Sequence, residues 1–409
     1  MRILYFHQHF GTPQGSTGTR SYEFAKALVA RGHRVTMVCG AFTLNGLSLP
    51  FDEERHWSRG DVEGIDVIAL PLPYSNRDGL VKRALVFLKF AWRSTLLALK
   101  EDYDVLFATS TPLTAGIPGI VMKLLGRGKP FVFEVRDLWP ELPRALGMKN
   151  PFALAGMSVL EWLSYRLSDA CVGLSPGIVE GIRRRSRKDL PIAMIPNGCD
   201  LDLFHPSMRR ELNLPGVGPG DFVAGFTGAH GIANGLDAVL DAGAELKRRG
   251  RKDIKIVLIG DGNQKDRLKK RSLSEGIDNV LFFPPVKKTE MARITASFDC
   301  GLMILANVEA FYYGTSPNKF FDYISAGIPV VNNYPGWLAD LIGQNGCGIA
   351  VPPESASAFA DALCLMADDP GRRGQMGQAG RRLAEREFNR AALADQFCRF
   401  LEMAAGGRK

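Results

Sequence analysis

The residues best suited to chemistry lie in one segment, from Tyr313 to Val331. It reads Tyr-Gly-Thr-Ser-Pro-Asn-Lys-Phe-Phe-Asp-Tyr-Ile-Ser-Ala-Gly-Ile-Pro-Val-Val. Thr315 or Ser316 can cap a helix whose free N–H groups would point at an anion. Lys319 and Asp322 are three residues apart and so share one helical face. That face could place an ammonium on a phosphate and a carboxylate on a ribose hydroxyl. An exposed ion pair of little consequence is the alternative.

A second candidate is the loop after the first apolar run. It holds Gly11, Gly15 and Gly18, followed by Thr19, Arg20 and a helical pattern. Glycines let the backbone approach a phosphate, and Arg20 adds a charged fork at a helix N-terminus. The spacing is not the Gly-x-Gly-x-x-Gly of dinucleotide binders, so hydride transfer is not expected. A loop that is merely flexible and solvated is the alternative.

Further polar residues follow strands of the first half. His7 and His9 alternate at the end of the first strand and so face one side. Such a pair is usually structural, but His7 is a candidate for ligand binding. Asp137 is a candidate helper base, with an internal ion pair to Arg136 as the alternative. Trp139 offers a flat apolar surface, suited either to a sugar face or to core packing.

The elements that position these residues alternate between apolar runs and helical periodicity. Such alternation predicts mostly parallel sheets with right-handed crossovers. Seven runs occur in the first half and five in the second, so two doubly wound sheets are expected. The runs are Ile3–Phe6, Val35–Cys39, Ile65–Leu70, Val105–Ala108, Phe131–Val135, Cys171–Leu174 and Ile192–Ile195, then Phe222–Phe226, Ile254–Ile259, Val280–Phe283, Gly301–Leu305 and Pro329–Val331.

The domain organisation follows from this restart of the pattern. We expect an N-terminal Rossmann-like domain at 1–200, a C-terminal Rossmann-like domain at 201–385, and a helix at 386–409 that packs back toward the first domain. The Gly- and Pro-rich stretch Asn213–Asp221 is interpreted as the linker. Asp200-Leu201-Asp202 resembles a metal-binding Asp-x-Asp, but no ligand spacing supports a metal site, and none is expected.

Composition narrows the partners. Lys and Arg number 51 against 43 Asp and Glu, which gives a formal net charge of +8 and favours anionic partners. No nucleic-acid signature appears, so no nucleic acid is expected to bind. The seven cysteines are scattered without a Cys-x-x-Cys pair, and we interpret them as buried free thiols of a reducing compartment. No apolar run is long enough to span a bilayer, and the start of the chain is interpreted as a strand and not as a signal peptide.

The stretch Val81–Lys100 is predicted to be an interfacial helix. At about 100° per residue, its basic residues fall near one line beside bulky apolar side chains. This pattern suits the surface of an anionic membrane. An ordinary amphipathic helix with its basic stripe in water is the alternative. The basic residues are Lys82, Lys89, Arg93 and Lys100.

Several motifs together resemble the family-four retaining glycosyltransferases of GT-B fold. They are the 313–331 segment, Pro196-Asn197-Gly198 ahead of Asp200 and Phe204, and Gly260-Asp261-Gly262 after a strand. Within that family the chain is similar to the WbuB-like transferases of bacterial surface-polysaccharide assembly, through Thr19–Glu23 and Arg136–Glu141. The resemblance covers nearly the whole chain. It implies an α/β fold with two Rossmann-like doubly wound domains facing across a cleft, the acceptor domain at 1–200 and the nucleotide-sugar donor domain at 201–385.

The resemblance also assigns roles to residues. Asp322 takes the place of the second Glu of the family's Glu-x7-Glu motif, while the first falls at Gly314, where Glu309 could substitute if its loop folds back. The Arg and Lys that usually face the diphosphate correspond to Ala229 and Asn234. Asp137, Glu309 and Asp322 are the expected catalytic residues. The expected donor-binding residues are Gly18, Thr19, Arg20, Gly228, His230, Gly231, Gly260, Pro285, Val286, Thr315, Ser316, Pro317, Asn318, Lys319 and Asp322, and the expected acceptor residues are His7, Glu134, Arg136, Asp137 and Trp139.

The resulting interpretation is a cytoplasmic transferase on the inner face of a bacterial plasma membrane. It would move a sugar, expected to be an N-acetylated amino sugar, from a UDP-sugar to a polyprenyl-diphosphate-linked saccharide in O-antigen, capsule or exopolysaccharide synthesis, without a cofactor. UDP and the polyprenyl carrier come from the resemblance alone. Two alternatives are a non-catalytic nucleotide-sugar-binding subunit and a nucleotide-sugar epimerase of GT-B fold.

Overall fold

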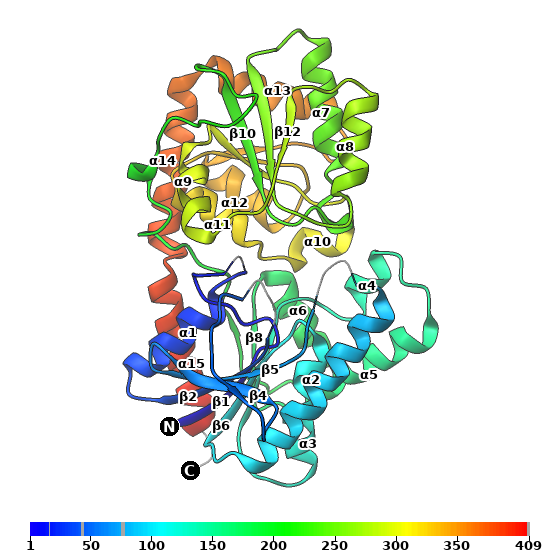
Figure 1. Cartoon of the computed structure of the whole chain (residues 1–409), viewed down its shortest axis with the longest axis vertical. Coiled ribbons are helices and arrows are strands. Elements are labelled where there is room, and N and C mark those ends of the chain that lie inside the picture. Colours follow the sequence, from blue (N-terminus) through cyan, green and yellow to red (C-terminus); the bar gives the residue numbers. More distant parts are fainter. Residues whose placement is uncertain (16, 42–44, 75–77, 407–409) are drawn as a thin grey trace. The chain divides into compact units, whose positions relative to one another are not determined.

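Two mainly parallel β-sheets organise the chain (Figure 1). The computed structural model describes residues 1–15, 17–41, 45–74 and 78–406. It divides into unit 1, which comprises Met1–Pro196, Gly314–Ser316 and Ala391–Lys409, and unit 2, which comprises Asn197–Tyr313 and Pro317–Arg390. These divisions fall within a few residues of the boundaries expected at 200 and 385. Residues 407–409 of the expected C-terminal helix lie outside the described residues.

Unit 1 contains a nine-stranded sheet in the order β3-β4-β5-β2-β1-β6-β7-β8-β9. The pairs β3–β4 and β4–β5 are antiparallel, and the other neighbours are parallel. Its central strands are buried apolar runs, as expected where helices cover both faces of a parallel sheet. The strands are β1 (Arg2–Phe6), β2 (Arg34–Gly40), β3 (Phe51–Asp52), β4 (Trp57–Val62), β5 (Ile65–Leu70), β6 (Val105–Thr109), β7 (Phe131–Val135), β8 (Ala170–Gly173) and β9 (Ile192–Met194).

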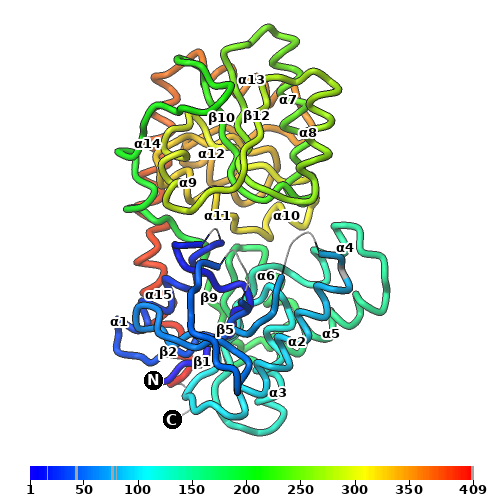
Figure 2. Tube along the Cα trace, viewed as in Figure 1, coloured from blue at the N-terminus to red at the C-terminus, as the bar shows by residue number. Residues whose placement is uncertain are grey.

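Helices cover both faces of this sheet. One hydrophobic cluster joins it to α1 (Arg20–Ala30) and to α15 (Arg390–Gly406), where Phe24 stacks on Phe397 at 4.5 Å between ring centroids. The chain therefore begins and ends in the same unit (Figure 2). A second cluster, on the other face, joins the sheet to α2 (Leu80–Lys100), α3 (Ile117–Leu124), α5 (Pro151–Leu167) and α6 (Pro176–Arg185). The 3₁₀ turn η1 (Leu113–Gly116) and α4 (Glu141–Ala145) complete the unit.

Unit 2 contains a six-stranded parallel sheet in the order β12-β11-β10-β13-β14-β15. Its strands are β10 (Phe222–Thr227), β11 (Ile254–Ile259), β12 (Val280–Phe283), β13 (Cys300–Met303), β14 (Val330–Asn332) and β15 (Gly348–Ala350). Its helices are α7 (Asp237–Arg248), α8 (Lys265–Ser274), α9 (Lys288–Ser297), α10 (Glu309–Gly314), α11 (Asn318–Ser325), α12 (Trp337–Asn345), α13 (Ala356–Asp368) and α14 (Pro370–Glu387), with 3₁₀ turns η2 (Pro206–Met208) and η3 (Ile232–Asn234).

The Gly- and Pro-rich stretch at 213–221 is not the linker that the sequence suggested. It belongs to unit 2, and the chain passes between units at Pro196–Asn197. The stretch folds onto itself and onto the sheet, because Gly218 N donates to Asp221 Oδ2 at 2.7 Å and a Cβ on Gly216 would touch Leu281. All seven cysteines are free, and all except the half-buried Cys364 are buried.

Candidate functional site

The carboxyl ends of β10 and β11 carry two loops of unit 2 that touch through their backbones. His230 N donates to Asp261 O at 2.9 Å. A Cβ on Gly260 would overlap the carbonyl oxygen of Gly228, and one on Gly262 would overlap the backbone of His230. Gly228 and Gly260 also have φ values of +140° and +151°, which disfavour other residues. Glycine is thus required at Gly228, Gly260 and Gly262. The two loops form a narrow backbone surface, called the backbone shelf below, of the kind that lets a phosphate approach.

Lys319 lies in the first turn of α11 and faces this shelf. Its Nζ donates to Asn234 Oδ1 at 2.9 Å and lies 4.4 Å from the ring centroid of Phe226. A Cβ on Gly228 would lie 3.3 Å from Lys319 Cε. No carboxylate among the described residues pairs with this ammonium, and its burial lowers the pKa of Lys319 to about 7. A half-buried ammonium without a counter-charge is stabilised when an anion binds beside it.

Asp322 follows Lys319 by one helical turn. Its side chain is half-buried, and Oδ1 is buried with no hydrogen-bond partner among the residues that the structure describes. Burial raises the pKa of Asp322 to about 6, against a weaker opposite effect of Lys288 and Arg390. The interpretation of these two residues as an i,i+3 ion pair is wrong, because Lys319 bonds Asn234 instead. A carboxylate oxygen that accepts no internal hydrogen bond suits a ligand hydroxyl.

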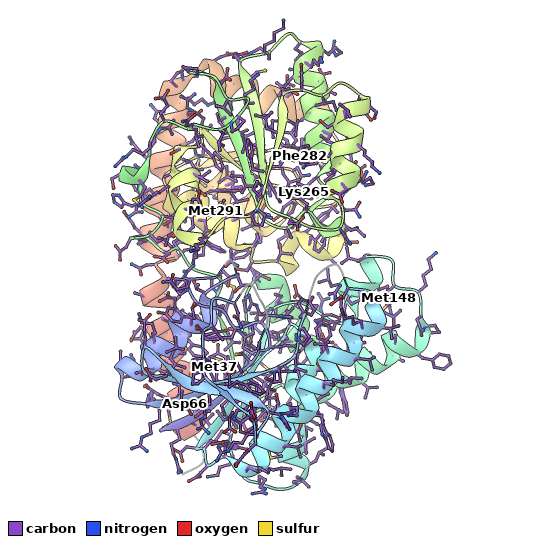
Figure 3. The ribbon with its side chains drawn as sticks, viewed as in Figure 1. Met37, Asp66, Met148, Lys265, Phe282 and Met291 are labelled. Carbon is purple, nitrogen blue, oxygen red and sulfur yellow. The ribbon has the colours of Figure 1, made fainter. Side chains whose placement is uncertain are left out.

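His230 is fully buried under the shelf between Phe226 and Phe282, at 6.1 and 6.2 Å between ring centroids. Burial lowers its pKa to about 4, so the imidazole is neutral at pH 7. Lys265 Nζ donates to the carbonyls of Gly260 and Phe283 at 2.6 and 2.7 Å and thereby ties the ends of β11 and β12 together. Figure 3 labels Lys265 and Phe282 in this part of unit 2. The sequence analysis did not select Lys265.

The other predicted donor residues of unit 2 lie around the same edge. Gly231 is the N-cap of η3, Pro285 is exposed and Val286 half-buried after β12, and Asn318 is the first residue of α11. The predicted cap is wrong, because Pro317, and not Thr315 or Ser316, occupies the N-cap of α11. Those two residues lie in the preceding segment, and Glu309 is exposed at the start of α10.

Arg20 was expected to hold a phosphate, and the structure contradicts this. Its side chain is 4% exposed, and Nη2 pairs with Glu134 Oε2 at 2.7 Å. The guanidinium also donates to the carbonyls of Ile195 and Pro196. Glu134, expected to contact the acceptor, is fully buried and accepts from Thr109 as well. Both residues therefore hold the interior of unit 1. Gly18 is exposed, and Thr19 is buried at the N-cap of α1.

The carboxyl ends of β1, β6 and β7 carry a polar cluster in unit 1. Arg136 Nη1 lies 3.3 Å from His7 Nε2, and Arg136 N donates to Ser110 Oγ at 2.8 Å. Because a guanidinium only donates, His7 Nε2 accepts and Nδ1 carries the proton. Burial holds the pKa of His7 well below its usual range, and Nδ1 has no hydrogen-bond partner in the described residues. His7 is thus a neutral hydrogen-bond donor through Nδ1, and not a general acid.

Asp137 belongs to the same cluster. Its Oδ2 accepts from Thr111 Oγ1 at 3.0 Å, so Thr111, and not an ion pair with Arg136, orients it. Burial raises the pKa of Asp137. Thr111 has a φ of +87°, an unusual conformation for a β-branched residue and one that occurs at functional sites. Trp139 packs against the core on the α2 face, which favours the packing role over a sugar platform.

Gln8 is a candidate that the sequence analysis missed. It is 1% exposed, and neither Nε2 nor Oε1 has a hydrogen-bond partner among the described residues. Buried polar atoms are normally paired, and exceptions need an explanation. A glutamine between two histidines at the end of the first strand was the available signal. With His7 and Arg136, Gln8 makes this edge of unit 1 a candidate acceptor site.

The Asp200-Leu201-Asp202 sequence has a structural role at Asp200. Asp200 pairs with Arg390 at 3.4 Å, its carbonyl accepts from Ser325 Oγ, and Asp202 is exposed. No group of three or more His, Cys, Asp or Glu in the described ranges could hold a metal ion. The expectation that no metal takes part stays a prediction.

Comparisons with known proteins agree with this architecture. A family model described as Glycosyl transferase 4-like domain matches residues 15–198, and one described as Glycosyl transferases group 1 matches residues 214–383. The D-inositol 3-phosphate glycosyltransferase of Arthrobacter sp. (strain FB24) is 31% identical over 193 residues, 46% of this chain and 44% of that protein. The chain thus spans about half the length of the curated relatives that it matches.

Solved structures show the same fold over the whole chain. Sucrose-phosphate synthase from Thermosynechococcus elongatus has a TM-score of 0.77 at 19% identity, with 98% of both chains covered. HepE of Anabaena, solved with UDP-glucose, has a TM-score of 0.70 at 18% identity and covers 98% of this chain and 99% of its own.

The two sheets and the loops at their carboxyl ends define an α/β protein of GT-B fold. Both family models match in tandem, in the order of the two units. The chain therefore belongs to the family-four glycosyltransferases of GT-B fold. The finer resemblance to WbuB-like transferases stays a prediction, because these comparisons match other members of the family.

Proposed function

We propose that this chain is an active retaining glycosyltransferase that moves a sugar from a UDP-sugar to a lipid-linked saccharide. The C1–O bond to the diphosphate breaks, a bond from C1 to an acceptor hydroxyl oxygen forms, the proton of that hydroxyl passes to the departing diphosphate, and UDP leaves. Such a leaving group departs faster when its developing charge meets fixed donors. The amino sugar, the polyprenyl carrier and a place in surface-polysaccharide synthesis are the finer parts of the proposal.

One observation carries the proposal. Within one turn of α11, unit 2 presents the ammonium of Lys319, unpaired by any carboxylate among the described residues, and a buried Asp322 oxygen that accepts no internal hydrogen bond. These two groups match a diphosphate and a ribose hydroxyl, and the glycine shelf at Gly228 and Gly260 suits phosphate oxygens. The solved HepE complex with UDP-glucose supports this choice of donor.

The family's usual Glu, Arg and Lys are replaced here by Gly314, Ala229 and Asn234, and this bears on activity. Asn234 accepts from Lys319 Nζ at 2.9 Å and so orients an ammonium that approaches from α11. We propose that Lys319 takes over the charge that the family usually supplies at this loop. In unit 1, Asp137 is the proposed helper base, and His7, Gln8 and Arg136 bind the acceptor.

The proposal includes the place in the cell where the protein works. A lipid-linked acceptor requires the protein to work at a membrane surface, which we place on the cytoplasmic side. No helix in the described part of the chain is both long enough and apolar enough to cross a bilayer. We also propose that no metal is needed, which predicts an unchanged rate after dialysis against EDTA.

Turnover with a donor panel tests the proposal. The protein is incubated with UDP-sugars, with and without a bacterial lipid extract, and UDP release is measured. We expect release that depends on the extract, and a loss of about 100-fold or more in Lys319→Met and Asp322→Asn. Asp202→Asn, which changes an exposed carboxylate of the same unit, serves as the control and should keep the rate.

The same experiment separates the alternatives. Donor binding without UDP release under any condition would favour a non-catalytic nucleotide-sugar-binding subunit. Conversion of the donor sugar without extract would favour an epimerase. Either result would overturn the proposed transfer.

A further inference from the structure

Helix α2 presents an apolar stripe directly opposite its buried side. Val86, Phe90 and Leu97 face the core. At about 100° per residue, the exposed stripe falls on the other side within an arc of about 80°. Its members are Val81, Leu85, Leu88, Trp92 and Leu96, exposed by 76%, 54%, 54%, 66% and 36%. A stripe of this kind is larger than the scattered apolar residues of ordinary surfaces.

Helix α5 carries a second stripe, which the sequence analysis did not select. Phe152 is 87%, Val159 56% and Trp162 44% exposed, and their spacing of seven and three residues puts them on one face. The helix α3 packs against both α2 and α5 and is itself mainly buried. Figure 1 shows the three helices together along one side of unit 1. We call the two exposed stripes together the α2–α5 face.

The charges around the α2–α5 face are mostly positive, although Asp78, just before α2, pairs with Lys82 Nζ at 2.7 Å. Helices α2 and α3 contain no Asp or Glu, and the single carboxylate of α5, Glu161, is buried and paired with Arg185. Lys82, Lys89 and Lys100 are exposed along one flank of the α2 stripe, and Arg166 is exposed at the end of the α5 stripe. Arg93 is half-buried and bonds the carbonyls of Arg55 and His56. Exposed apolar side chains flanked mainly by cations fit an anionic lipid surface.

The N-terminal half of α2 also contacts the candidate acceptor site. Phe87 lies 5.7 Å from Tyr74 and 6.2 Å from His9, and His9 lies 4.6 Å from Tyr74 between ring centroids. Arg83 lies over the Tyr74 ring at 5.7 Å. His9 follows His7 and Gln8 on the same loop. This aromatic cluster therefore joins the helix to the edge where an acceptor would bind.

We infer that unit 1 docks on an anionic bilayer through the α2–α5 face, with α2 and α5 lying along the lipid surface. The inference rests on the proposed function for its purpose, since a lipid-linked acceptor needs such contact. It goes further by adding α5 to the predicted helix and by fixing which side of unit 1 meets the lipid.

Vesicle binding tests the inference. The full-length protein is sedimented with vesicles of phosphatidylcholine alone and of equal parts phosphatidylcholine and phosphatidylglycerol. We expect clear binding only to the anionic vesicles. Trp92→Glu and Phe152→Glu should each abolish it, and Lys82→Glu with Lys89→Glu should weaken it by about tenfold or more. Leu273→Glu, at a residue 85% exposed on α8 of unit 2, is the matched control and should bind like the unchanged protein.

Three outcomes would overturn the inference: no vesicle binding, equal binding to both compositions, or loss in Trp92→Glu but not in Phe152→Glu. A dimer that dissociates in Trp92→Glu without vesicle binding would show that a second copy covers the face. UDP affinity, measured on the same variants, should stay unchanged. Transfer to a soluble acceptor without vesicle binding would refute docking alone, whereas vesicle binding without transfer to any acceptor would refute the proposed function alone.

Discussion

Arg20 and Glu134 form a buried ion pair in unit 1, with Nη2 and Oε2 2.7 Å apart and side chains 4% and 0% exposed. Thr109 and the carbonyls of Ile195 and Pro196 satisfy the remaining positions. A buried charge that loses its partner is costly, since its desolvation is no longer offset. The pair therefore holds the interior of the unit together.

We predict that Arg20→Ala or Glu134→Ala lowers the free energy of unfolding by about 3–5 kcal/mol, as measured by urea denaturation. Arg20→Met combined with Glu134→Leu should cost much less. Arg184→Ala, which breaks the exposed pair with Glu180, should change stability by less than about 0.5 kcal/mol. An Arg20→Ala protein that is stable but has lost UDP affinity would show that Arg20 binds the phosphates after all.

Lys319 predicts a pH dependence of donor binding. Its pKa is about 7 without ligand, because of burial, and a bound diphosphate raises it. The contribution of Lys319 to affinity should therefore be constant below about pH 7, and affinity should fall by up to tenfold per unit above it. Calorimetry with a UDP-sugar and no acceptor measures this, with uptake of protons on binding near pH 7. Lys319→Met should bind weakly without this slope, and the exposed Lys269→Met should keep it. A slope that persists in Lys319→Met would contradict the assignment.

Asp322 predicts opposite effects on stability and activity. Burial raises the pKa of Asp322 to about 6, above the unfolded value of about 3.9. The free energy of unfolding therefore falls as the pH rises between these two values, and the buried carboxylate destabilises the fold fully above about pH 6. At pH 7, Asp322→Asn should raise the free energy of unfolding by about 2 kcal/mol, with no gain near pH 4. The same variant should lose turnover. Asp202→Asn should change neither, and a destabilised Asp322→Asn would show that the carboxylate is structural.

Gln8 predicts a selective effect on the acceptor. Replacing a buried amide whose atoms are unpaired by an apolar side chain of similar size removes a desolvation cost. Gln8→Met should therefore keep or raise thermal stability, while KM for the acceptor rises by about tenfold and KM for the donor stays constant. The exposed Gln378→Met is the control. An unchanged acceptor KM would remove Gln8 from the site.

Most of the strands were predictable, because the parallel strands are buried apolar runs. The strands that were missed have other origins. β4 reads Trp-Ser-Arg-Gly-Asp-Val and becomes a strand through its antiparallel partner β5, not through its own pattern. β15 is only three residues long, and pairing with β14 defines it.

The site was predictable in its residue types but not in its pairings. The sequence places Arg20 beside glycines but does not say which way the side chain points. A glutamate inside the apolar run Phe-Val-Phe-Glu-Val was the available hint, since a buried carboxylate needs a cation. The bond between Lys319 and Asn234 joins residues 85 apart in sequence, which no local pattern encodes.

The backbone contact between the loops after β10 and β11 has a consequence for how this protein can diversify. Because the loop after β10 fills the space that a side chain at Gly260 or Gly262 would need, neither glycine can be replaced without a change in that loop. Natural or laboratory variants that accept a different sugar should therefore carry their substitutions elsewhere, with the backbone shelf unchanged.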